Sequence, residues 1–238
     1  MEDEQWCPEA AMKAYLSTLQ LCKGDEGESR AVVAEPEYTE FISALAAGNG
    51  AQLIVEIASE TTPLTLALAV AAKQTGGQFV CILPTHHQLQ SCESHVSIRY
   101  PELKDAIKFM SGDDPCEIMT SFDRHVDFVV INDSEFEEHL RLLEVMMRKQ
   151  PGINGRRSVV HVVERLGRSS KGTGRVVSFG EAVRGREGVV DSVSLPVSGG
   201  VELTRIKNKA AAGGTTCGKV GSGGGRRCRR FHVIVENR

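Results

Sequence analysis

The chain has 238 residues, of which 41% are hydrophobic and 25% charged. These fractions are typical of a globular protein with a sizeable core, and they exclude a wholly disordered chain. The net charge of −3 hides an uneven distribution, because residues 1–60 carry twelve acidic and three basic side chains, whereas residues 203–235 carry eight basic ones and no acidic one. An acidic head and a basic tail therefore share one chain.

The composition also limits location and metal content. No apolar run reaches the roughly 18 residues that a membrane span needs, and the acidic N-terminus has no hydrophobic signal region. The seven cysteines are an odd number without a Cys-x-x-Cys pair, which argues against a disulfide framework and a zinc cage. We therefore expect a protein of the cytoplasm or the nucleus, with reduced thiols, no bound metal and no membrane partner.

Two helices are predicted before the first strand. The first begins near Pro8, and its apolar positions recur at the 3.6-residue spacing of one helix face: Met12, Tyr15, Leu16 and Leu19. The second begins at Pro36 and ends at Gly48-Asn49-Gly50. Proline suits the first position of a helix because its missing N–H would have no helical partner there.

Alternating strands and helices follow. Residues 51–57 (AQLIVEI) and 79–83 (FVCIL) are apolar enough for strands covered on both faces, and the helix predicted over 64–74 joins them into a βαβ unit. Further helices are expected over 86–96, after Asp113-Asp114-Pro115, and after the capping box Ser134-x-x-Glu137. The remaining strands are expected over residues 106–110, 126–131, 158–163, 189–197 and 201–206, the last two as an antiparallel hairpin. This order predicts an α/β fold with a doubly wound, mixed seven-strand sheet.

We expect three regions along the chain. Residues 1–34 hold a helix and an acidic loop, residues 35–207 form the sheet domain, and residues 208–238 make a flexible basic tail rich in Gly and Arg. The cluster Arg226–Arg230 could bind a protein or another acidic surface, direct nuclear import, or stay solvated without a partner. Phe231 is the sole aromatic beside it, so specific nucleic-acid binding is not indicated.

Five ordered segments carry a resemblance to a known family: WCPEAAMKAYLSTL, EFISALAAGNGAQLIVE, LALAVAAKQTGGQFVCILP, VDFVVIND and VSLPVSGGVELTRI. Together they resemble a plant family of domains of unknown function, numbered fourteen-forty-two, which is grouped with the class I S-adenosylmethionine-dependent methyltransferases. The resemblance implies a Rossmann-like sheet that ends in a β-hairpin, and a cofactor, S-adenosylmethionine, at the carboxyl ends of the first four strands.

The resemblance also implies site residues. Glu56 takes the place of the acid at the end of the first strand, and Ser59 offers a hydroxyl in the loop that follows. Asp113, after the third strand, corresponds to the loop that meets adenine, although capping of the next helix is the alternative role for this residue or for Asp114. Asp133, after the fourth strand, is the candidate catalytic residue that faces the methyl acceptor.

Two departures from the superfamily pattern leave two functions open. The loop over 57–62 has no glycine where backbone would approach the cofactor, and residues 83–87 offer no carboxylate to the ribose. The favoured hypothesis is a methyltransferase-like binding or scaffold protein with a degenerate cofactor site. The alternative hypothesis is an S-adenosylmethionine-dependent methyltransferase with an unidentified acceptor.

Overall fold

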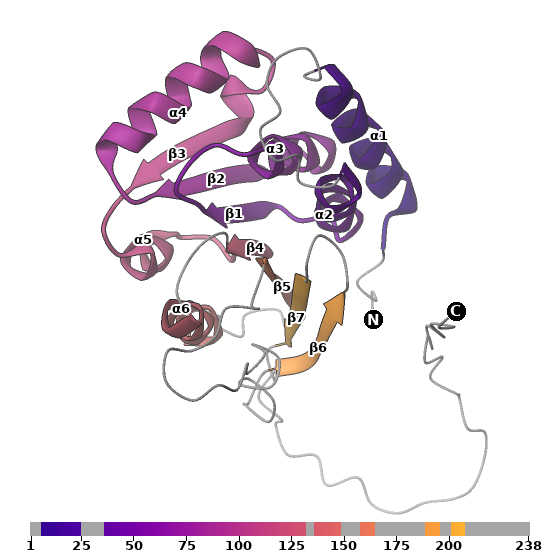
Figure 1. Cartoon of the computed structure of the whole chain (residues 1–238). Helices are drawn as coiled ribbons and strands as arrows, with labels where there is room; N and C mark the ends of the chain where they lie inside the picture. Colours follow the sequence, from indigo (N-terminus) through magenta and orange to yellow (C-terminus); the bar gives the residue numbers. More distant parts are fainter. Residues whose placement is uncertain are drawn as a thin grey trace, which may run out of the picture.

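The structure, a computed structural model, describes residues 6–24, 36–131, 136–148, 158–164, 189–195 and 201–207 (Figure 1). Helices and strands alternate in the order that the sequence predicts. The helices are α1 (Pro8–Gly24), α2 (Pro36–Gly48), α3 (Pro63–Thr75), α4 (His86–Arg99), α5 (Pro115–Ser121) and α6 (Phe136–Arg148), with a short 3-10 turn at Lys104–Ala106. The strands are β1 (Leu53–Ile57), β2 (Gln78–Leu83), β3 (Ile107–Ser111), β4 (Phe128–Ile131), β5 (Ser158–Glu164), β6 (Val189–Leu195) and β7 (Val201–Lys207).

Across the described residues, the strands form one sheet in the order β3-β2-β1-β4-β5-β7-β6. The pairs from β3 through β5 are parallel, while β7 runs antiparallel to both β5 and β6. The predicted α/β fold with a parallel sheet is therefore confirmed. The chain reverses its direction of winding between β1 and β4, and open α/β sheets bind ligands beyond the carboxyl ends of the strands at such a point.

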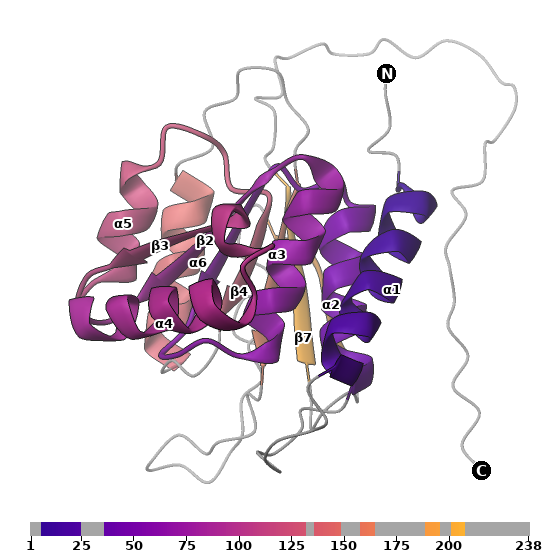
Figure 2. The ribbon, with the colours of Figure 1, turned by 90° about the horizontal axis from the view of Figure 1, so that it is seen from above.

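Helices lie on both faces of the sheet (Figure 2), and a cluster of buried apolar side chains lies on each side. Side chains alternate between faces along a strand, so Ile54 and Phe128 pack with α2, α3 and α4, whereas Val55 and Val129 pack with α5 and α6. All five side chains of β1 and all four of β4 are buried. This two-sided burial explains why these strands are almost continuously apolar in the sequence.

Helix α1 packs through a different face from the one that its apolar spacing predicts. The buried positions are small, Ala11, Ala14 and Thr18, and the Thr18 hydroxyl donates to Ser43 of α2 at 3.0 Å. Ser43 in turn donates to the carbonyl of Ala67 in α3 at 2.9 Å. Small side chains let the three helices approach closely, and this packing leaves the predicted face outward. Met12, Tyr15 and Leu16 are exposed.

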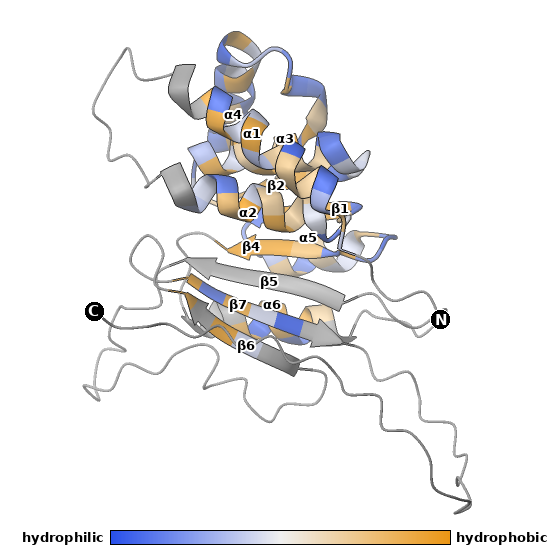
Figure 3. Cartoon of the chain, turned by 90° about the vertical axis from the view of Figure 1, so that its right-hand side faces the viewer, coloured by the Kyte–Doolittle hydropathy of each residue, from blue (hydrophilic) through white to orange (hydrophobic). Residues whose placement is uncertain are grey.

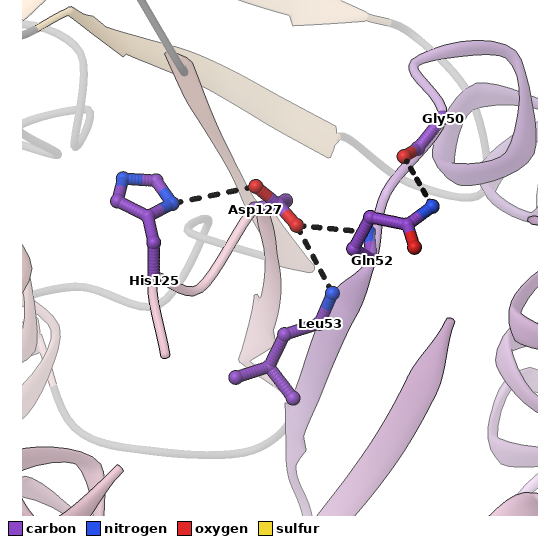
Figure 4. Close-up of polar contacts among 5 residues, drawn as sticks. All are labelled: Gly50, Gln52, Leu53, His125 and Asp127. Carbon is purple, nitrogen blue, oxygen red and sulfur yellow. Dashed lines mark hydrogen bonds and ion pairs between the residues drawn. The ribbon is translucent and has the colours of Figure 1, made fainter. Parts of the chain in front are cut away.

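The amino ends of β1 and β4 are joined by one carboxylate (Figure 4). Asp127 Oδ2 accepts from the backbone N–H groups of Gln52 and Leu53 at 2.8 and 3.0 Å, and Asp127 Oδ1 lies 3.3 Å from His125 Nδ1. Burial opposes ionisation of Asp127, but the hydrogen bonds from His125 and the two amides outweigh it and lower its pKa. This contact fixes the two strands that border the winding reversal.

Some expected features lie outside the described residues. These are the capping box at Ser134, the stop at Pro151-Gly152 and the tail over 208–238. Among the described helices, none is long and apolar enough to cross a membrane.

Candidate functional site

The candidate site is the edge of the sheet at which β1, β2 and β3 end. Backbone hydrogen bonds join the three ends, because Ala58 N–H donates to the carbonyl of Ile82 and Gly112 N–H donates to that of Leu83, both at 3.1 Å. Helices α3, α4 and α5 begin at this edge, and their N-caps are Thr62, Thr85 and Asp114. The helix starts and the loops before them therefore form the surface that a ligand would meet.

Glu56, the predicted acid of the first strand, is fully buried. In the register of β1 and β2 it lies beside Cys81. Burial raises the pKa of the Cys81 thiol well above its usual value, and the adjacent Glu56 carboxylate raises it further. Glu56 thus lies within the layer between the sheet and α3, among core side chains, rather than on the surface of the loop.

Ser59 lies on that surface, and its backbone is tied to α4. The side chain is exposed, while the carbonyl accepts from Gln88 Nε2 at 3.0 Å. The oxygen of the same side-chain amide, Oε1, accepts from the Thr85 hydroxyl at 2.6 Å. The amide of Gln88 therefore bridges the loop after β1 and the first turn of α4.

Sequence reasoning missed Gln88, although a signal was present. Thr85-x-x-Gln88 has the pattern of a capping box, in which the first residue caps a helix and the fourth reaches back to it. The Thr85 hydroxyl accepts from the Gln88 backbone N–H at 3.2 Å, as that pattern predicts. The same motif begins α4, which extends to Arg99, three residues beyond the predicted end.

Thr61 is a second hydroxyl residue of the loop that contains Ser59. Its hydroxyl oxygen is buried in the loop after β1 and has no hydrogen-bond partner among the described residues. A buried hydroxyl without a partner costs free energy, so it marks a place where a ligand or water would be favourable.

The two aspartates after β3 take different roles. Asp114 caps α5, since its Oδ1 accepts from the Cys116 backbone N–H at 2.8 Å, and its Oδ2 accepts from Arg141 of α6 at 2.7 Å. The hydrogen bond from Arg141, followed by that from Cys116, lowers the pKa of Asp114. Asp113 is exposed one residue earlier. The capping role thus falls to Asp114, and Asp113 keeps its carboxylate in solvent.

This division of roles predicts unequal effects of substitution. Asp114→Ala should lower the free energy of unfolding by about 1 kcal/mol, the usual cost of losing an N-cap, whereas Asp113→Ala should leave it nearly unchanged. Urea unfolding of both variants at neutral pH measures the difference. Equal losses in the two variants would contradict the assignment of the cap.

Asp133, the candidate catalytic residue, lies outside the described residues, so its distance from Glu56, Ser59 and Asp113 is not defined. Within the part of the chain that the structure describes, no group of three or more His, Cys, Asp or Glu side chains could hold a metal ion. His86 and His87 are exposed on the first turn of α4.

The sequence matches a family model described as "Protein of unknown function (DUF1442)" over residues 4–222. The chain belongs to this family. Among curated proteins, none matches the chain.

Several solved structures similar to this DUF1442 chain are methyltransferases. The O-methyltransferase from Bacillus cereus in complex with SAH aligns with a TM-score of 0.59 and 17% identity, over 82% of this chain and 90% of that one. The SAH-bound methyltransferase PaMTH1 from Podospora anserina aligns with a TM-score of 0.57 and 13% identity, over 86% and 90%. TomG from Streptomyces achromogenes, in complex with SAM, aligns with a TM-score of 0.55 and 19% identity, over 87% and 92%. At these identities the likeness establishes a class I methyltransferase-like fold and nothing finer.

Proposed function

We propose that this DUF1442 chain is a methyltransferase-like binding or scaffold protein whose cofactor site is degenerate. The observation that carries the proposal is the bridge from Gln88 to the Ser59 carbonyl at the ends of β1 and β2. A ligand lying across these two strand ends would have to displace that bond. The Thr85 hydroxyl contacts Gln88 twice, because it donates to Oε1 of the side chain and accepts from the backbone N–H.

The chemistry of the loops supports the same conclusion. Side chains fill positions 57–62, where glycine would let the backbone approach a ligand, and residues 83–87 contain no carboxylate for a pair of ribose hydroxyls. Glu56 is buried beside Cys81 rather than exposed to the loop. The residues present therefore do not fit S-adenosylmethionine in the mode expected for this fold, and we derive no methyl-transfer step for them.

The second candidate function is S-adenosylmethionine-dependent methyl transfer. Two features favour it: the exposed carboxylate of Asp113 after β3, and the buried hydroxyl of Thr61 without a partner among the described residues. In this alternative, Asp113, Ser59 and Glu56 would hold the cofactor, and Asp133 would face an acceptor. The three solved relatives named above contain SAH or SAM.

Titration of the full chain with S-adenosylmethionine and S-adenosylhomocysteine separates the two functions. The proposal expects no heat of binding and no shift in Tm at about 1 mM ligand. For comparison, a ligand that does bind would stabilise the folded state by about 2.7 kcal/mol at a concentration of 100 times its Kd. Micromolar affinity would contradict the proposal and support the methyltransferase, in which case Asp113→Asn should weaken binding about tenfold, corresponding to 1.4 kcal/mol.

Gln88→Ala serves as the companion variant. If the bridge excludes the ligand, removing it should raise the affinity for S-adenosylhomocysteine above that of the parent chain. Gln90→Ala is a matched control, because Gln90 lies in the same helix turn and bonds His86 instead of the loop. Identical behaviour of the parent and Gln88→Ala, both without binding, would mean that the loop side chains rather than the bridge exclude the ligand.

A further inference from the structure

The outer side of α1 carries a group of exposed apolar side chains, called here the α1 stripe. Its members and their exposed fractions are Trp6 at 47%, Met12 at 59%, Tyr15 at 37% and Leu16 at 48%. In Figures 1 and 2, α1 is the outermost helix on its side of the molecule, and Figure 3 views the molecule from that side. The clustering of such side chains on one helix marks an interaction surface.

Contacts with α2 hold the stripe in one orientation. Cys7 N–H donates to the carbonyl of Gly48 at 2.8 Å, and the Trp6 indole lies where a Cβ atom of Gly48 would be. Further along the helix, Thr18 is buried and donates to Ser43. A partner would therefore meet a preformed surface, whose binding costs little conformational entropy.

Two exposed charges lie within the stripe, and their order indicates the partner. Glu9 and Lys13 are one helical turn apart and form a 2.7 Å ion pair. Trp6 precedes Glu9 by three residues, and Leu16 follows Lys13 by three residues. The order is therefore apolar, acidic, basic, apolar, and it becomes apolar, basic, acidic, apolar in the reverse direction. A second α1 that runs antiparallel to the first presents Lys13 to Glu9 and Leu16 to Trp6.

We propose that α1 binds α1 of a second copy of this chain, as an antiparallel pair about a two-fold axis near Met12. A two-fold interface uses the same surface on both copies, so each favourable contact occurs twice. Glu9 of each copy meets Lys13 of the other, and no like charges face each other. A partner with one sign of charge would instead meet one like and one opposite charge, and like charges across an interface are costly. This inference does not depend on the function of the candidate cofactor site.

The exposed area agrees with this occupant. Large side chains have about 200 Å² of surface each, so the four roughly half-exposed members of the stripe offer about 400 Å². Because interfaces are about 57% apolar, this area corresponds to about 700 Å² of interface on each copy. A specific protein interface takes about 800 Å² from each partner. We therefore expect a reversible dimer with a Kd on the order of 10 µM, at the weak end of the range for such areas.

Light scattering of the full chain tests the dimer. The mass should rise from the 25.8 kDa of one chain toward twice that value between about 1 and 100 µM protein, on either side of the expected Kd. Trp6, the one tryptophan of the chain, should emit at shorter wavelength at the higher concentration, because the dimer buries it. Leu16→Asp should abolish both effects. Ile98→Asp is the matched control, because Ile98 is 78% exposed on α4, and it should abolish neither.

Charge reversal tests the antiparallel alignment. Glu9→Lys places two basic side chains on each stripe, and Lys13→Glu places two acidic ones, so each variant alone should dimerise at least tenfold more weakly than the parent chain. An equimolar mixture of the two variants should dimerise like the parent, because basic side chains then face acidic ones. Both positions are exposed, so each variant should keep the Tm of the parent within about 2 °C when it is measured at a concentration where the chain is monomeric.

Three results would overturn the proposal. The first is the mass of one chain at about 100 µM, ten times the expected Kd, which would assign the stripe to a different partner. The second is a dimer that Leu16→Asp leaves intact, which would place the interface elsewhere on the chain. The third is a mixture of Glu9→Lys and Lys13→Glu that dimerises no more tightly than either variant alone, which would exclude the antiparallel pairing of the two helices.

Discussion

Replacing Gly77 by alanine is expected to lower the free energy of unfolding by about 3 kcal/mol or more, because overpacking against backbone cannot be relieved by side-chain rotation. A Cβ atom at Gly77 would lie 2.7 Å from the Ala51 carbonyl oxygen, 2.8 Å from that of Gln52 and 2.9 Å from the Gln52 Cα. The same stretch of backbone pairs with β2, since Gln78 N–H donates to the Gln52 carbonyl at 2.8 Å. The substitution would therefore separate the first residues of β1 and β2.

Gly76→Ala provides the matched control. Gly76 is the adjacent residue, it ends α3 with φ of 66°, and a Cβ there would meet nothing within 4 Å. Its cost should come from left-handed backbone strain alone, about 1 kcal/mol. Thermal unfolding should show Tm falling by roughly 6–12 °C for Gly77→Ala and about 2–4 °C for Gly76→Ala. If Gly76→Ala lowered Tm more than Gly77→Ala, close approach of the backbone would not be the reason for glycine at position 77.

Asp127→Ala is expected to cost about 3 kcal/mol at pH 7, because hydrogen bonds to a charged group contribute about 1.5–3 kcal/mol and the two amides would lose their acceptor. Asp127→Asn keeps an oxygen for the amides of Gln52 and Leu53, so its cost should be about 1 kcal/mol. The side chain of Asp127 is 12% exposed, which limits replacement of the lost contacts by water. Urea unfolding of the three proteins measures these differences.

The difference between the parent chain and Asp127→Ala should depend on pH. The pKa of Asp127 is lower in the folded chain than its ordinary value of 3.8, so the ionised carboxylate stabilises the fold above that value. This contribution should be lost as the pH falls below about 4 and through the folded pKa. A difference in unfolding free energy that stays constant from pH 7 to pH 3 would show that the negative charge of Asp127 does not contribute.

Predictions from the sequence were most successful where one local rule governs the structure. Residues 51–57 and 79–83 became β1 and β2 because strands buried on both faces need continuous apolar side chains. Pro36 and Pro63 begin α2 and α3, because helix starts leave N–H groups that only certain residues satisfy. The sequence left the cap of α5 open between Asp113 and Asp114, and the structure assigns it to Asp114. Helix α4 was predicted although its apolar period is weak. The period is weak because Cys92 and Val96 are the buried side chains of this helix.

The sequence alone determined the alternation of strands and helices, the closing β-hairpin and the DUF1442 resemblance, because periodicity, caps and motifs are properties of neighbouring residues. Tertiary structure decided which face of α1 is buried. The large apolar side chains, such as Met12, favour burial of one face, whereas small side chains, such as Ala14, let the backbone of α1 approach its neighbours through the opposite face. It also decided that Glu56 lies beside Cys81 and that Gln88 bridges to Ser59. These contacts join residues far apart in the chain, and their geometry depends on strand register and helix placement, which no local pattern encodes.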